Sequence, residues 1–285
     1  MNSAFFHSSL KVRNHVSRIE VIKDSAGNLF EGDNVYQPFV QHYEKFFGSQ
    51  GDISLTPAPD LFSKVLAPQV ATHMIRQVTA EEVKRPCFLL VSIKRLVLMG
   101  NLLRELNHTN IVLIPKIPTP SAVIDYRPIA CCNVLYKCIS KIVADRIKNA
   151  LNDIVSINQS AFVLGRRISD NIMLTQELMH NYHRHSGPPR CAFKVDIQKA
   201  YDTVDWGFLR NALLGFGFHR KMVEWIMVCV STASFSICVN GTVHGFFMGK
   251  RGLRQGDPSF IINAKNSRLS IFVLPMICSC FFFFG

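Results

Sequence analysis

The chain has 285 residues, and its 32 Lys and Arg against 20 Asp and Glu give a formal net charge of +12. Apolar residues make up 48% and charged residues 18%. This composition excludes a mostly disordered chain, because enough apolar surface is available to offset the entropy of ordering. The basic balance favours a polyanionic partner, either a nucleic acid or an acidic membrane surface, and composition alone leaves both open.

The first part of the chain predicts helix and linker. A helix capped by Asp33 or Asn34 is expected to run to about Phe47, because apolar side chains recur along it at helical spacing. Residues 48–59 are rich in Gly, Ser and Pro, which indicates a linker. Residues 61–109 carry no clear period and are expected to be a degenerate linker at the start of the next region.

The pattern becomes clearer from Asn110 onward. Residues 111–114 predict a short strand ended by Pro115, and Ser140 is a candidate cap for a helix through Leu151. That helix is expected to turn Ile142, Val143, Ile147 and Leu151 inward and Lys141, Arg146 and Lys148 outward. A second helix, capped by Asp170, is expected to reach about Tyr182.

The second half mixes strands and helices without a repeated strand–helix–strand unit. Residues 191–197 predict a strand, Asp205 a cap for a helix over 206–214, and residues 220–230 another helix. Two strand-like runs, 234–239 and 242–248, flank Asn240-Gly241, the dipeptide that most strongly favours a type I′ hairpin turn. The sequence therefore predicts an α+β fold.

The nine cysteines show neither zinc-ligand spacing nor a disulfide framework. We interpret them as reduced core residues of an intracellular protein with no disulfide partner. The charge-free stretch 269–285 leaves a tail anchor in a membrane open as an alternative. Its length of 17 residues and Pro275 speak against membrane insertion.

Two local patterns suggest phosphate chemistry. Asp196 ends the predicted strand, where a carboxylate suits a hard cation such as Mg²⁺, although an ordinary surface aspartate has the same spacing. Residues 250–258 combine three cations, two glycines and a proline, which suits close approach to a phosphate but also an ordinary basic turn. Residues 111–150 carry six cations against two carboxylates, a net charge of +4, on a nucleic-acid groove or a solvated helix face.

Eight motifs, in order and at family-like spacing across roughly residues 100–259, give a specific resemblance. They are Leu113–Lys116, Asp125–Ile129, Tyr136–Lys137, Ser140–Arg146, Gln159–Val163, Gly165–Arg166, Lys194–Trp206 and Arg251–Pro258. Together they resemble the reverse transcriptase of a plant-type non-LTR (LINE) retrotransposon. Residues 1–60 resemble the connector that precedes the polymerase domain in such polyproteins.

The resemblance implies a right-hand polymerase with fingers and a partial palm over residues 110–259. It implies that Asp196 is the catalytic aspartate and binds Mg²⁺ with help from the backbone carbonyl of Ile197. By the same resemblance, the nucleotide-binding residues are Lys116, Arg127, Tyr201, Gln255 and Gly256. The expected nucleic-acid-binding residues are Lys137, Lys141, Arg146, Lys148, Arg166, Arg251 and Arg254. Expected partners are an RNA template and DNA primer, or an RNA–DNA hybrid, with deoxynucleotides, in the cytoplasm or nucleus.

The chain also departs from the family. The family's second carboxylate pair, in an Ala-Asp-Asp box on a palm hairpin, has no counterpart, because residues 260–285 contain no Asp or Glu. The resemblance also leads us to expect that the thumb is missing, and 260–285 is expected to be an apolar tail unrelated to the family. We therefore expect a truncated, catalytically inactive fragment. The alternative is a remnant that binds RNA or an RNA–DNA hybrid without turnover.

Overall fold

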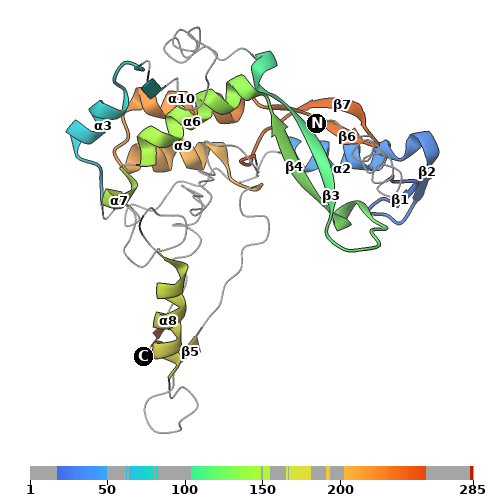
Figure 1. Cartoon of the computed structure of the whole chain (residues 1–285), viewed down its shortest axis with the longest axis horizontal. Coiled ribbons are helices and arrows are strands. Elements are labelled where there is room, and N and C mark those ends of the chain that lie inside the picture. The colour runs from blue at the N-terminus through green and yellow to red at the C-terminus, as the bar shows by residue number, and fades with distance from the viewer. Residues whose placement is uncertain are drawn as a thin grey trace, which may run out of the picture.

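The computed structural model describes residues 18–49, 64–79, 81–82, 104–148, 150–154, 167–180, 191–192, 202–254 and 283–284, with the single residues 62 and 165. These residues form two lobes, one of helices and one built on a sheet (Figure 1). The combination of helices with a mixed sheet confirms the predicted α+β class.

A four-stranded sheet in the order β4–β3–β6–β7 forms the second lobe. Its strands are β3 (His108–Pro115), β4 (Tyr126–Cys132), β6 (Ser234–Val239) and β7 (Thr242–Met248). Strand β3 is antiparallel to β4 and parallel to β6, and β6 forms a hairpin with β7. The expected hairpin turn is confirmed, because Asn240 and Gly241 have φ values of 50° and 85°, both positive as a type I′ turn requires.

The N-terminal segment covers one face of this sheet. Its elements are β1 (Val21–Lys23), β2 (Leu29–Glu31), the 3-10 turn η1 (Gly32–Asn34) and α2 (Tyr36–Gly48). Phe39, Tyr43 and Phe47 of α2 are buried against Phe235 and Ile237 of β6 in one apolar cluster. The predicted apolar face is confirmed, but the predicted cap is wrong. The helix begins after Val35, and no side chain caps it.

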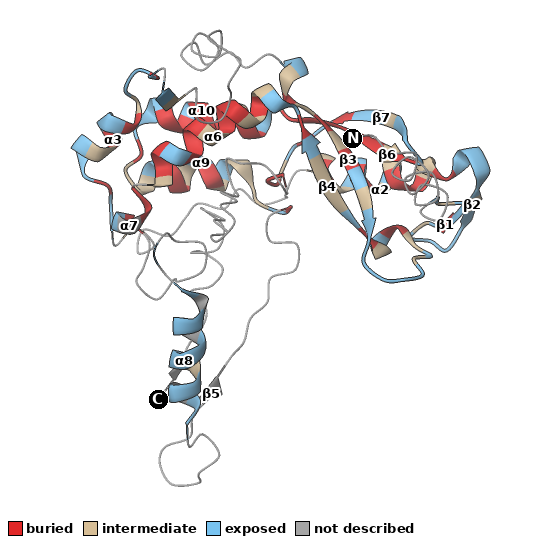
Figure 2. Cartoon of the chain, in the orientation of Figure 1, coloured by how far each residue is buried: buried red, intermediate tan, exposed pale blue. Residues whose placement is uncertain are grey.

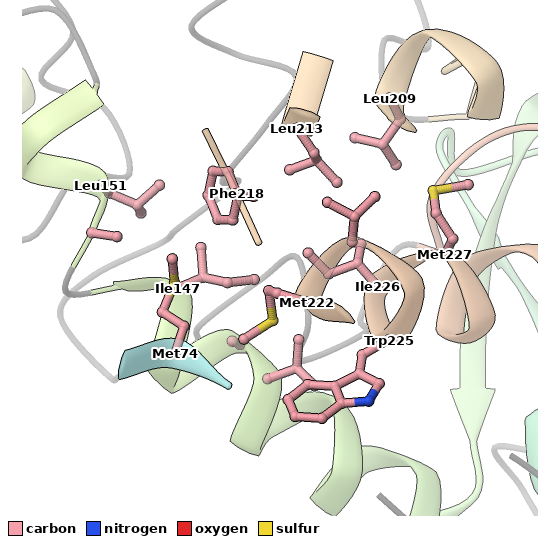
Figure 3. Packing of buried hydrophobic residues seen from close by; sticks show 14 of the residues in the cluster. Met74, Ile147, Leu151, Leu209, Leu213, Phe218, Met222, Trp225, Ile226 and Met227 are labelled. Atoms are coloured by element: carbon pink, nitrogen blue, oxygen red, sulfur yellow. The ribbon is translucent and has the colours of Figure 1, made fainter. Parts of the chain in front are cut away.

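The helical lobe has a core of its own. It contains α3 (Pro68–Met74), α6 (Val134–Lys148), α7 (Leu151–Ile154), α9 (Trp206–Gly215) and α10 (Arg220–Ser231). Figure 3 shows Ile147, Leu213, Met222, Trp225 and Ile226 packed together in this core. The expected inward face of α6, with Ile142, Val143, Ile147 and Leu151 of α7, is confirmed by their burial.

The start of α6 differs from the expectation. The helix begins at Val134, so Ser140 lies inside it, fully buried, and its hydroxyl donates to the carbonyl of Lys137. Asn133 lies just before the helix, and its Oδ1 accepts from the amide of Leu135 at 2.8 Å. An asparagine before the first turn performs the capping that the sequence assigned to Ser140.

Two predicted caps on later helices have different outcomes. Asp205 caps α9 as expected, since its Oδ1 accepts from the amide of Phe208 at 2.7 Å. Helix α8 (Ile168–Met179) has Arg167 at its N-cap position without a side-chain bond, and Asp170 lies in the first turn instead. Figure 2 shows α8 exposed along most of its length, apart from the two lobes.

Short elements complete the described chain. They are the 3-10 turns η3 (Arg104–Asn107) and η4 (Val123–Asp125), and β5 (Cys191–Ala192), which pairs with β8 (Phe283–Phe284). Of the predicted strand 191–197, only its first two residues are described. Over the part of the chain that the structure describes, no helix is both long and apolar enough to cross a bilayer.

One cysteine differs from the expected reduced state. Cys138 of α6 is disulfide-bonded, whereas Cys131 and Cys238 are free thiols. The prediction that no cysteine has a disulfide partner is therefore wrong at Cys138. The spacing of cysteines along a chain does not report which of them the fold brings within bonding distance.

Candidate nucleotide and nucleic-acid site

Residues 250–258 are called the basic turn below, and the structure describes its first part, Lys250 to Arg254. This part leads into the predicted nucleotide-binding residues Gln255 and Gly256. The amide of Gly252 donates to the carbonyl of Val204 at 2.8 Å, and Trp206 Nε1 donates to the carbonyl of Gly252 at 2.9 Å. Val204 and Trp206 belong to the motif that also contains Asp196. The described end of that motif is therefore bonded directly to the start of the basic turn.

Only glycine fits at position 252. Its φ of 83° lies in the left-handed region, and a Cβ there would lie 2.4 Å from the carbonyl oxygen of Asp202. This closeness lets the backbones of the two motifs touch. The basic turn is thus fixed against Asp202 by the shape of the main chain as well as by hydrogen bonds.

Two carboxylates near the basic turn, Asp202 and Asp205, are a buried side chain and a helix cap. Asp205 caps α9, and Asp202 is only 5% exposed. Burial, together with the charge of Asp202, raises the pKa of the Tyr43 hydroxyl. Asp202 and Arg254 line the same small hollow, together with Phe47 of α2 and Phe235 of β6. Among the described residues, no group of three His, Cys, Asp or Glu side chains could hold a metal ion.

Arg254 lies at the junction between the two lobes and is 8% exposed. Its Nη1 donates to Thr109 Oγ1 at 2.9 Å and to the carbonyl of Asn107 at 3.3 Å, and its Nη2 donates to the carbonyl of Cys229 at 3.1 Å. The guanidinium carbon lies 4.1 Å from the centroid of the Tyr136 ring. The expectation that Arg254 contacts nucleic acid is not supported by this placement, because the guanidinium binds inside the protein.

Arg146 is a second buried arginine, and the expectation that it faces outward is wrong. Its side chain is 2% exposed and makes an ion pair with Glu82. All five of its N–H groups have acceptors: both carboxylate oxygens of Glu82 and the carbonyls of Met74, Arg76 and Gln77. Arg146 therefore fastens the segment after α3 to α6 and has no donor left for a phosphate.

Three lysines on α6 are half-buried and lie along one stripe. Lys137, Lys141 and Lys148 are separated by four and seven residues, a spacing that keeps side chains on the same side of a helix. Lys141 Nζ makes an ion pair with Asp145 Oδ1 at 2.6 Å. On α6, this lysine stripe is the part of the predicted cationic cluster that stays accessible, because Arg146 is buried.

Lys116 and Arg127 are exposed at the far end of the β3–β4 pair, where Arg127 is opposite Ile114. Lys116 donates from its amide to the carbonyl of Asp125 at 2.7 Å and from Nζ to the carbonyl of Ile124 at 2.6 Å. Bonds from the amides of two residues before η4 lower the pKa of the Asp125 carboxylate, with a smaller contribution from the charge of Lys116.

The described chain does not bring this pair to the basic turn. Arg254 binds Thr109 at the start of β3, whereas Lys116 follows the end of that strand. Seven residues of extended strand span roughly 23 Å. Six other predicted site residues lie outside the described residues: Arg166, Asp196, Ile197, Tyr201, Gln255 and Gly256.

A family model described as "Reverse transcriptase (RNA-dependent DNA polymerase)" matches residues 114–259, just over half of the chain. The chain belongs to the reverse transcriptase family. The match contains β3 from Ile114 onward, the lysine stripe and the basic turn, and it confirms the recognition that the motifs gave. The segment 18–49, which covers the sheet, lies outside the match.

Three curated relatives share a stretch of this reverse transcriptase. The "Transposon TX1 uncharacterized 149 kDa protein" of Xenopus laevis is 27% identical over 166 residues, which cover 58% of this chain and 12% of that protein. A Pol polyprotein from the type-2 retrotransposable element R2DM of Drosophila melanogaster is 26% identical over 174 residues, which cover 61% of this chain and 16% of that protein. A Pol polyprotein from the type-1 retrotransposable element R2 of Nasonia vitripennis is 25% identical over 159 residues, which cover 56% of this chain and 15% of that protein.

The chain thus matches less than a fifth of the length of each of these relatives. They bear out the non-LTR retrotransposon resemblance, while its plant type stays a prediction. The carbonyls that hold the turn could not be predicted from the sequence, because every residue has one. The burial of Arg146 and Arg254 was missed because arginine on a helix or in a turn normally indicates an exposed residue.

Proposed function

We propose that this chain is a non-LTR retrotransposon reverse transcriptase domain that binds RNA or an RNA–DNA hybrid but does not polymerise by itself. The observation that carries the proposal is the bond between Gly252 and Val204, which keeps two polymerase motifs joined. The lysine stripe and the net charge of +12 supply the attraction to a polyanion. Such a partner implies a location in the cytoplasm or nucleus.

The small number of carboxylates available to metal ions supports the proposal of binding without turnover. By family, Asp196 and the carbonyl of Ile197 would hold Mg²⁺, and the ion would supply positive charge against the phosphoryl group being transferred. Two such ions require several converging carboxylates. Asp205 is occupied as a helix cap, Asp202 is buried, and residues 260–285 contain no acidic residue. The described carboxylates therefore do not fit a second ligand set, and this chain of 285 residues is expected to lack turnover.

The nucleotide pocket is proposed on the family alone. In that assignment Gln255 and Gly256 lie near the templating base pair, and Tyr201 lies under the incoming sugar. Lys116 and Arg127 would hold the triphosphate, which requires the far end of β3 and β4 to approach the basic turn. Fluorescence anisotropy with labelled deoxynucleotide tests this assignment, with Lys116→Ala as the variant and the exposed Lys45→Ala as its control.

Titration of the full chain with a labelled RNA–DNA hybrid tests the binding function. Three lysines that each neutralise one phosphate predict a slope of log K against log salt of about −2 to −3. Affinity should therefore fall about 16-fold to 60-fold between 50 and 200 mM salt, with little dependence on base sequence. An affinity that does not change with salt would contradict the proposal.

A further inference from the structure

The C-terminal end of α2 contacts the start of the basic turn. The amide of Lys250 donates to the carbonyl of Phe47 at 2.8 Å, and Arg251 Nε donates to the carbonyl of Phe46 at 3.0 Å. The Arg251 guanidinium also lies over the Phe46 ring, 5.6 Å from its centroid. The last carbonyls of a helix have no partner within the helix, and a cation near that end is favoured by the helix dipole.

Helix α2 is fixed firmly enough to act as a support. The Phe47 ring stacks on that of Phe235 in β6, with centroids 5.1 Å apart. Gly245 of β7 has a φ of 68°, and a Cβ there would lie 2.7 Å from Val40 of α2, so the helix and the strand approach closely. Packing of this kind leaves α2 little freedom to shift relative to the sheet.

The segment before α2 is tied to the sheet lobe at two further places. The amide of Ile19 donates to Asn240 Oδ1 and Asn240 Nδ2 donates back to the carbonyl of Ile19, both at 2.9 Å. The amide of Lys23 donates to the carbonyl of Ser121, also at 2.9 Å. Residues 18–49 thus bind regions that the family model matches, although they lie outside that match themselves.

We propose that residues 18–49 belong to the same folding unit as the polymerase motifs, and that Arg251 is a positioning residue which joins α2 to the nucleotide-facing turn. The turn is held from two sides: Lys250 and Arg251 bind the end of α2, and Gly252 binds Val204. Without Arg251, the first of these attachments is reduced to a single backbone bond. This proposal rests on the proposed function at one point: it takes the basic turn to be the segment that faces the nucleotide.

Hydrogen–deuterium exchange of the full chain without nucleic acid tests the attachment. The amide of Gly252 is bonded, so its exchange reports local opening of the turn. Loss of a charged hydrogen bond in Arg251→Ala should speed exchange over residues 250–254 about tenfold. Amides of α10 and β6 should keep their rates. Arg251→Lys retains a cation and one donor, and is expected to recover most of the protection.

The exposed Arg210 on α9 supplies a matched control, and Arg210→Ala should leave exchange over 250–254 unchanged. The proposal is overturned if Arg251→Ala exchanges like the unaltered chain. It is also overturned if exchange rises equally in α10 and β6, since that shows general destabilisation. If Arg251→Ala does not fold, the same exchange experiment is done with Arg251→Lys. Faster exchange in that variant that is equal over residues 250–254, α10 and β6 contradicts the proposal. Failure of hybrid binding would refute the proposed function and leave this result standing.

Discussion

Arg254 and Tyr136 converge on one backbone atom, the carbonyl oxygen of Cys229. Arg254 Nη2 donates to it at 3.1 Å and the Tyr136 hydroxyl at 3.3 Å, while the guanidinium lies over the tyrosine ring. The tyrosine is completely buried. The two side chains connect the basic turn with α6 and with the last turns of α10, so the junction of the lobes is also the base of the candidate site.

Removal of the buried Arg146 guanidinium should be strongly destabilising. Arg146→Ala removes two of the hydrogen bonds to Glu82 and leaves three carbonyls without this donor, and breaking a buried ion pair costs about 3–5 kcal/mol. Urea denaturation followed by circular dichroism measures the loss. The half-exposed Lys148 of the same helix is the control, and Lys148→Ala should change the free energy of unfolding by less than about 0.5 kcal/mol. Equal effects would contradict the assigned role of Arg146.

Substitution of Gly252 should destabilise the fold through both strain and overlap. In Gly252→Ala the left-handed backbone is strained and the new Cβ lies 2.4 Å from the Asp202 carbonyl oxygen. We expect a loss of about 2–4 kcal/mol in the free energy of unfolding. Gly27 has a φ of 91° and no atom within 4 Å of a Cβ, so Gly27→Ala isolates the strain. It should cost about 1 kcal/mol in the same denaturation experiment.

Stability should fall in acid as Glu82 becomes protonated. Burial raises its pKa, but the hydrogen bonds from Arg146 and the Thr79 amide, with the charges of Arg146 and Arg76, outweigh burial and lower the pKa from 4.5 to about 2. The contribution is therefore complete above pH 4.5 and lost as the pH falls toward 2. Thermal melts across this range check it. Glu82→Gln should flatten the dependence, and an unchanged dependence would show that other groups cause it.

The lysine stripe should set the salt dependence of binding. Lys137→Ala removes one half-exposed ammonium group of the stripe and should lower the slope of log K against log salt by about one for a lost phosphate contact. The same change at Lys141 also breaks its ion pair with Asp145. Anisotropy titrations at several salt concentrations measure the slopes. Lys45 on α2 is exposed and far along the chain from the stripe, so Lys45→Ala should keep the original slope.

Primer extension should give no product. With Mg²⁺ or Mn²⁺ and an RNA template annealed to a DNA primer, the chain should extend no more primer than its Asp196→Ala variant. The reason is that, among the described carboxylates, Asp205 caps a helix and Asp202 is buried, while two cations about 4 Å apart need several converging carboxylates. Extension that Asp196→Ala abolishes would show that a ligand outside the described residues completes the site.

The sequence alone determined the local structure of the second half of the chain. Asn240-Gly241 fixes the hairpin, because few residues other than Asn and Gly adopt its two left-handed positions. Asp205 fixes the start of α9 through one bond to a nearby amide. The ordered motifs identified the family that the match over residues 114–259 shows. Each of these signals depends on residues close together or on order along the chain.

Only the tertiary structure decided which cations remain available at the surface. The sequence predicted that Arg146 and Arg254 are exposed and contact phosphates, yet both bind backbone carbonyls from distant segments. Helix α2 read as part of a connector, yet its end holds the basic turn about 200 residues later through Lys250 and Arg251. Carbonyl acceptors carry no side-chain signature, so the burial of an arginine follows from which helix and strand ends the fold brings beside it.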